Sequence, residues 1–124
     1  MCRMSMVETE GLHHIHLRVR DLDRSLRFYQ QVFGMQEMFR DGDLVFLNTP
    51  GSGDTITLNP HDEGLAGESG GIEHFGFRLK PGVSYDHAIE AVEAGGGRLI
   101  RRGEHAPDVP YVYIADPDGY VIEL

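Results

Sequence analysis

The sequence contains one cysteine, no tryptophan and few basic residues. With Cys2 alone, no disulfide can form within the chain, which suits a reducing compartment. Eleven Lys and Arg against twenty Asp and Glu give a net charge of −9, which argues against binding to a nucleic-acid backbone or an anionic membrane. No apolar run approaches the roughly 20 residues of a membrane span, and residues 1–10 lack the apolar core of a signal peptide. We therefore expect a cytoplasmic protein, and its 124 residues suit a single domain.

The first half of the chain predicts one strand, one helix and three shorter strands. Residues 14–19 alternate polar and apolar side chains, as a half-buried strand does. Apolar residues then recur at helical spacing after Asp21 or Asp23, either of which can cap a helix, and Gly34 closes it. Strand-like runs separated by turn residues follow near residues 35–40, 44–48 and 55–59.

The second half repeats this order. Residues 72–79 alternate again, Ser84 can cap a second helix, and three consecutive glycines from Gly95 end it. The last strand-like runs lie near residues 98–102, 111–115 and 120–124. We therefore predict an α+β fold of two βαβββ modules, with an unrelated α+β arrangement as the alternative. The expected bounds are about 11–60 for module one, 60–71 for a connector and 72–124 for module two.

Both modules begin with a histidine on the polar face of the first strand. Apolar residues occupy the other face of each strand and are expected to meet the helix. A single histidine of this kind is most often a surface residue, but His14 and His74 hold matched positions in two repeated units. If both sheets curl in the same direction, these polar faces line a shared cup.

A carboxylate joins these histidines from the last strand. Residues 116–119, Asp-Pro-Asp-Gly, form a strong turn signal and lead into Tyr-Val-Ile-Glu-Leu. Glu123 stands there between apolar neighbours, either at a sheet edge facing water or compensated by a cation. Two imidazoles and a carboxylate can form one face of an octahedral metal site and leave positions open for substrate.

Three stretches of the sequence resemble the vicinal-oxygen-chelate superfamily, which includes glyoxalase I, fosfomycin-resistance transferases and extradiol dioxygenases. They are HIHLRVRDLDRSLRFYQQVFG, GIEHFGF and YIADPDGYVIEL, at residues 14–34, 71–77 and 113–124. The resemblance implies paired modules that form a cup-shaped mixed sheet around a divalent metal. It carries the metal ligands over to His14, His74 and Glu123.

Thr57 departs from the family pattern. Many members have a fourth ligand, Glu or Gln, at this place, and glyoxalase I uses a carboxylate there to move a substrate proton. A threonine hydroxyl is far too weak an acid to act as that base at neutral pH. The three-ligand set therefore resembles that of the dioxygenases and the fosfomycin-type transferases.

Three further residues are candidates for catalysis. Tyr113 lies ten residues before Glu123, where both of these groups place an active-site tyrosine, although a packing aromatic is the alternative. His105 is near the place of a neighbouring histidine in extradiol enzymes, with a different loop spacing. His16 shares the face of His14 and can shuttle protons near neutral pH, or it can simply face solvent.

These features favour a metal-dependent enzyme acting on a small substrate that chelates the metal through neighbouring oxygens. A dioxygenase-like reaction with Fe(II) is the leading hypothesis, and a homodimer is expected. A thiol transferase or glyoxalase-like lyase using Mn, Ni or Zn is the alternative. A metal-free binding protein of the bleomycin-resistance type is a third hypothesis, which the intact ligand set and the lack of tryptophan disfavour.

Overall fold

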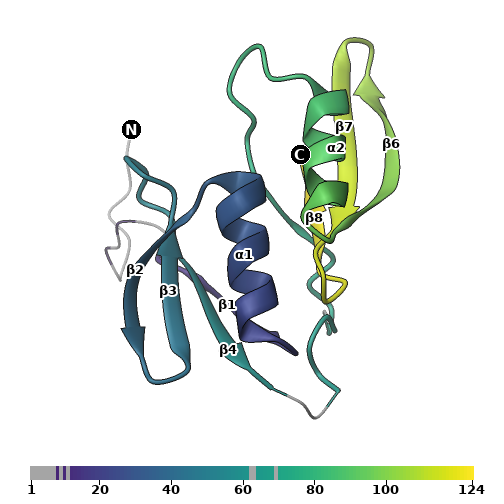
Figure 1. The fold of residues 1–124 in the computed structure, drawn as a ribbon. Coiled ribbons are helices and arrows are strands. Elements are labelled where there is room, and N and C mark those ends of the chain that lie inside the picture. Colours follow the sequence, from purple (N-terminus) through teal and green to yellow (C-terminus); the bar gives the residue numbers. More distant parts are fainter. Residues whose placement is uncertain (1–7, 9, 11, 62–63, 69) are drawn as a thin grey trace.

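The structure is a computed structural model that describes residues 8, 10, 12–61, 64–68 and 70–124. It consists of two modules, each with one helix packed on one face of a four-stranded sheet (Figure 1). Module one contains β1 (Ile15–Val19), α1 (Leu22–Phe33), β2 (Gln36–Asp41), β3 (Leu44–Asn48) and β4 (Ile56–Pro60). Module two contains β5 (Phe75–Gly76), α2 (Tyr85–Ala94), β6 (Arg98–Ala106), β7 (Val109–Ala115) and β8 (Val121–Glu123).

The two sheets share one topology. Their strand orders are β1-β4-β3-β2 and β5-β8-β7-β6, so the first strand of each module lies at an edge beside the last one. β1 and β4 are parallel, as are β5 and β8, while the remaining pairs are antiparallel. This arrangement confirms the predicted α+β fold of two βαβββ modules.

Both helices begin and end where the sequence predicts. The Asp21 side chain accepts a hydrogen bond from the Arg24 backbone N–H, and Ser84 does the same for His87. Gly34 ends α1 in the left-handed conformation with φ 69°, which glycine adopts without strain. The local caps therefore set the helix bounds.

The strand bounds differ most from the prediction at β5 and β6. Residues 72–79 alternate, yet β5 contains only two residues, because its partner β8 has only three. β6 is longer than predicted and reaches Ala106, because it forms a long hairpin with β7. Strand length here depends on the partner strand, which the local pattern does not reveal.

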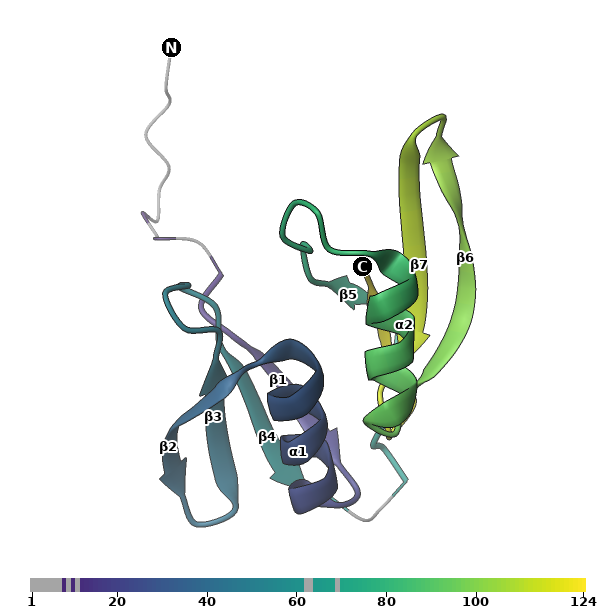
Figure 2. The same cartoon turned by 45° about the horizontal axis from the view of Figure 1, so that its top comes forward.

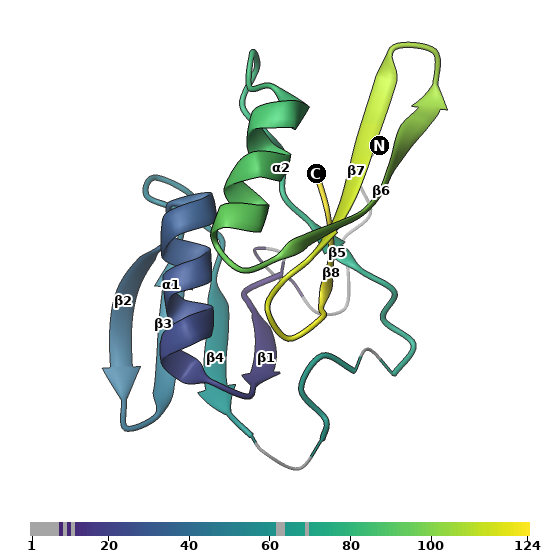
Figure 3. The same cartoon turned by 45° about the vertical axis from the view of Figure 1, so that its right-hand side comes forward.

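The core lies between each helix and its sheet, and it continues between the modules. Leu17 and Val19 of β1 are buried against the core while His16 and Arg18 are exposed, as the alternation predicts. α1 contacts α2, and the Phe33 ring stacks on Phe77 of the second module at 4.3 Å between ring centroids. Figures 2 and 3 show the two helices each covering their own sheet. Among the described residues, neither helix has the length and apolar character needed to cross a membrane.

Candidate metal centre

Glu123 lies at the centre of a row of residues that crosses the second sheet. It pairs with Tyr113 of β7 on one side and with Gly76 of β5 on the other, so these positions share one face. A Cβ atom at Gly76 would lie 2.9 Å from the Glu123 carbonyl oxygen. Glycine therefore permits β5 to approach β8 closely at this point.

Two imidazoles hold the Glu123 carboxylate. His74 Nε2 lies 3.0 Å from Oε1, and His105 Nε2 lies 2.8 Å from Oε2. The hydrogen bond from His105 lowers the pKa of Glu123, with a further contribution from the charges of His105 and His74. The side chains of His74 and Glu123 are about three-quarters buried, with exposed fractions of 27% and 26%. The carboxylate is therefore ionised and held in one orientation at neutral pH.

Tyr113 borders the same group. Its ring meets the His74 ring edge to face, with 5.0 Å between centroids. Desolvation raises the pKa of Tyr113, and the negative charge of Glu123 raises it further. The phenol is therefore neutral and able to donate a hydrogen bond to an oxygen atom bound nearby.

The equivalent row in module one is filled differently. His16 pairs with Thr57 across β1 and β4, in the register that Gly76 and Glu123 occupy in module two. His16 Nδ1 lies 2.7 Å from Thr57 Oγ1, and its Nε2 lies 2.8 Å from Asn59 Oδ1. His16 thus holds the position that Gly76 holds in module two, and the Thr57 hydroxyl is already bonded to it.

His14 lies apart from this cluster. It is exposed, and its Nδ1 lies 2.9 Å from Nδ1 of His13. In the part of the chain that the structure describes, no three His, Cys, Asp or Glu side chains are grouped so that they could hold a metal ion. Within one chain, His74, His105 and Glu123 lie together in module two, whereas His14 and His16 lie in module one. The donor types suit a divalent metal, yet the three-residue ligand set stays a prediction.

Three residues beside the predicted group contribute contacts that sequence reasoning missed. Glu73 Oε1 lies 3.1 Å from His74 Nδ1, where it can orient the ring. The Arg101 guanidinium lies over the Tyr111 and Tyr113 rings, 5.7 and 5.3 Å from their centroids. The Tyr111 ring also stacks on the His105 ring, with 4.3 Å between the centroids. Glu73 could have been found because it is next to His74 in the sequence. Strict alternation along a strand would place these two neighbours on opposite faces, but β5 begins only at Phe75, so Glu73 and His74 lie outside it.

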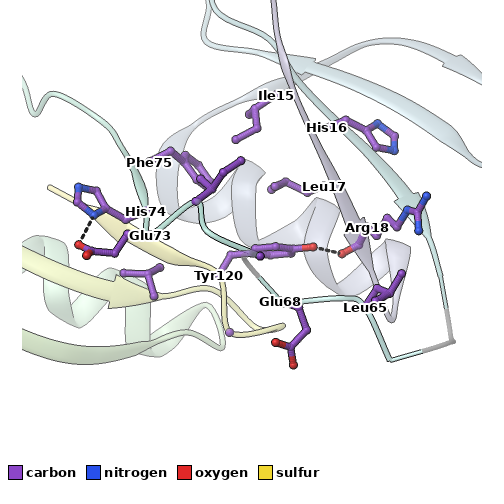
Figure 4. A pocket seen from close by; sticks show the side chains of 15 residues that line it. Ile15, His16, Leu17, Arg18, Leu65, Glu68, Glu73, His74, Phe75 and Tyr120 are labelled. Carbon is purple, nitrogen blue, oxygen red and sulfur yellow. Dashed lines mark hydrogen bonds and ion pairs between the residues drawn. The ribbon is translucent and has the colours of Figure 1, made fainter.

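A cavity of about 400 Å³ separates β1 from the second module. Its walls are mostly apolar and include Ile15, Leu17 and Phe75. Figure 4 shows His16 on one side of this cavity and His74, with its contact to Glu73, on the other. The cavity therefore extends from His16 of module one to His74 of module two.

The family model of the Glyoxalase/Bleomycin resistance protein/Dioxygenase superfamily matches residues 11–124. The protein belongs to this superfamily.

Individual relatives differ in the reaction that their names state. The chain is 32% identical over 125 residues to lactoylglutathione lyase of Haemophilus influenzae, covering 90% of this chain and 88% of that protein. It is 27% identical over 115 residues to the manganese-dependent 2,3-dihydroxybiphenyl 1,2-dioxygenase of Geobacillus genomosp. 3. That match covers 90% of this chain and only 35% of the dioxygenase.

Solved structures share the fold. The fosfomycin resistance protein FosX of Listeria monocytogenes, in complex with Mn(II) and sulfate, has a TM-score of 0.76 at 23% identity, over 94% of this chain and 90% of that chain. The integron cassette protein HFX_CASS4, from a sewage-outfall metagenome, has a TM-score of 0.71 at 23% identity, over 93% and 97% of the two chains. At this identity the likeness establishes the fold and leaves the reaction open.

Proposed function

We propose that this protein is a divalent-metal-dependent enzyme whose metal is bound by His74 and Glu123 of one chain and His14 of a second copy. The observation that carries this proposal is the Glu123 carboxylate, which lies 3.0 Å from His74 Nε2 beside the ring of Tyr113. The third donor, His14, is exposed and lies outside this cluster in its own chain. A symmetric dimer that joins module one of one copy to module two of the other completes two identical sites.

Manganese and iron are the metals to test first. Two imidazoles and one carboxylate with open positions form the donor set typical of non-haem Fe(II) oxygenases, and Mn(II) accepts the same donors. The names of two similar proteins, the Geobacillus dioxygenase and the Listeria FosX complex, state manganese. We therefore propose either Mn(II) or Fe(II) as the bound metal, with no preference between them.

The substrate that suits this site is a small molecule with two neighbouring oxygen atoms. A bound divalent metal would supply Lewis acidity and positions for the substrate and a second small reactant. Glu73 and His105 orient the two ligands of module two, and the Tyr113 phenol donates a hydrogen bond to a substrate oxygen. The apolar cavity beside His74 accommodates the carbon skeleton of the substrate and excludes water from it.

Thr57 favours oxygen chemistry over isomerisation. A lyase of the glyoxalase type needs a base on β4, the strand that contains Thr57. Thr57 offers only a hydroxyl, and the residue is 2% exposed and already bonded to His16. A dioxygenase acting on a catechol-like substrate needs no carboxylate there. We therefore propose dioxygenase-like activity.

A lactoylglutathione lyase activity is the second candidate. The observation that favours it is 32% identity over nearly the whole of a lyase of similar length. Under this proposal another group must accept the substrate proton, and His16 is the titratable side chain bonded to Thr57.

Metal analysis of protein purified without oxygen tests both candidates. The protein is then loaded separately with Fe(II) and Mn(II), and oxygen uptake is followed with a panel of catechols. Lactoylglutathione formation from methylglyoxal and glutathione is measured in parallel. We expect ring-opened product from at least one catechol, and loss of metal in His74→Ala. Lyase activity without oxygen uptake would replace the first candidate with the second, and the absence of bound metal would refute both.

A further inference from the structure

Three residues at every second position hold the turn before β8 against module one. Tyr29 of α1 donates a hydrogen bond from its hydroxyl to Asp116 Oδ2 at 2.8 Å. The Tyr120 hydroxyl donates to the Arg18 carbonyl oxygen of β1, also at 2.8 Å (Figure 4). Between them, Asp118 makes the largest set of contacts. Residues 87 to 102 positions apart in the sequence are thus joined at one place.

The Asp118 carboxylate is completely buried and fully engaged. Its Oδ1 accepts from the Arg20 backbone N–H at 3.0 Å and from Arg24 Nη2 at 3.1 Å, and its Oδ2 accepts from the Ser25 hydroxyl at 3.0 Å. Arg20 Nη1 contributes a further ion pair at 3.3 Å. A buried carboxylate is tolerated only with such compensation, so removal of Asp118 leaves polar groups of module one without their acceptor.

The connector closes the other side of the turn. Arg20 Nη2 donates to the Ala66 carbonyl oxygen at 2.8 Å. Gly67 has φ +84°, and a Cβ atom there would lie 2.2 Å from the Asp118 carbonyl oxygen. The turn is therefore held between α1 and the connector.

In the described part of the chain, the equivalent loop of module one makes no hydrogen bond to module two. There, Asp54 accepts hydrogen bonds from the backbone N–H and the hydroxyl of Thr49, both at 2.7 Å, within the same loop. Asp54 thus closes its own loop, whereas the Asp118 carboxylate accepts hydrogen bonds from Arg20, Arg24 and Ser25 of the other module. This difference indicates that the contact serves more than the closing of a turn.

We propose that Asp118 is a positioning residue that fixes the orientation of module two on module one, and with it the place of Glu123. β8 contains three residues, follows the turn directly, and among the described residues pairs with β5 and β7 of its own module. Those pairings hold Glu123 beside His74 but do not set its place relative to β1. The Asp118 contacts constrain this place, because they join the start of β8 to the corner between β1 and α1.

Distance measurement between the modules tests this inference without any metal. Nitroxide labels are placed at Asp43→Cys and Pro107→Cys, in exposed turns of module one and module two, in a Cys2→Ser background. Pulsed electron paramagnetic resonance then gives the distance distribution, after dilution with unlabelled protein so that only labels within one chain are seen. Asp118→Asn and Asp118→Ala are compared with the matched control Asp54→Ala. Tyr120→Phe provides a milder change at the same turn should the Asp118 variants fail to fold.

We expect one narrow distribution for the wild type and Asp54→Ala, and a broadened or shifted one for the Asp118 and Tyr120 variants. An unchanged distribution in folded Asp118→Asn and Tyr120→Phe would overturn the inference. A second readout rests on the proposed function: the Mn(II) affinity should fall by roughly tenfold in Asp118→Asn, as for groups that orient metal ligands, and not in Asp54→Ala. If the wild type binds no Mn(II), the proposed function fails, while the distance result still decides the role of Asp118.

Discussion

His105 illustrates how one side chain can shape the site without belonging to its predicted ligands. Its side chain is about half exposed, yet its Nε2 holds Glu123 Oε2 at 2.8 Å. We expect His105→Ala to leave the melting temperature nearly unchanged and to weaken Mn(II) or Fe(II) binding by roughly tenfold, because a free carboxylate must be reoriented on binding. Isothermal titration calorimetry measures this affinity, and His87→Ala, which alters an exposed histidine of α2, is the control. An affinity equal to that of the wild type would show that His105 does not position Glu123.

Tyr29 couples the packing of the modules to pH. Burial raises the pKa of Tyr29 well above 10.0, and the negative charge of Asp116 raises it further. Above about pH 10, the unfolded chain loses this proton while the folded chain keeps it, so the free energy of unfolding falls as pH rises. We expect urea denaturation to show a shallower alkaline slope for Tyr29→Phe than for the wild type. Equal slopes would mean that Tyr29 does not carry this dependence.

Tyr29→Phe also removes the hydrogen bond to Asp116. At neutral pH the variant should therefore be less stable by about 1 kcal/mol or somewhat more, because Asp116 loses a buried donor. The test of the pH dependence is thus the difference in slope and not the difference in stability itself.

At the scale of elements, the junction between α2 and β6 depends on a glycine. A Cβ atom at Gly97 would lie 2.5 Å from the Ala115 carbonyl oxygen and 2.8 Å from Val92 Cγ1, both parts of the packed interior. We expect Gly97→Ala to destabilise the protein by about 1–3 kcal/mol, the range for overpacking. Thermal or chemical denaturation measures this loss. Gly53→Ala is the matched control, since nothing lies within 4 Å of its Cβ position, and an equal loss in both variants would contradict the argument.

The elements were predictable because their signals are local. Alternation marked β1, helical spacing marked α1, and Asp21 and Ser84 cap the helices from within their own turns. The lengths of β5 and β6 were not predictable, because a strand extends only as far as its partner. A residue pattern carries no information on that partner.

At the scale of the whole molecule, the proposed site requires two copies of the chain. Purified His14→Ala and His74→Ala proteins should each fail to bind metal. A mixture in which subunits exchange should regain about a quarter of the wild-type sites, since half of the dimers are mixed and each mixed dimer has one intact site. Metal content and oxygen uptake after mixing measure the recovery. No recovery in mixtures shown by mass spectrometry to contain mixed dimers would refute a site shared between subunits.

Local residue patterns were enough to predict the two βαβββ modules, because alternation, capping and turn residues act over a few neighbouring positions. The sequence also singled out His74, Glu123, His105 and Tyr113, which the structure brings together in module two. The contacts of His16 with Thr57 and of Asp118 with Arg24, in contrast, were visible in the folded chain and not in the residue pattern. Such contacts depend on strand register and on the docking of segments far apart in the chain, and no local pattern records which distant surfaces will meet.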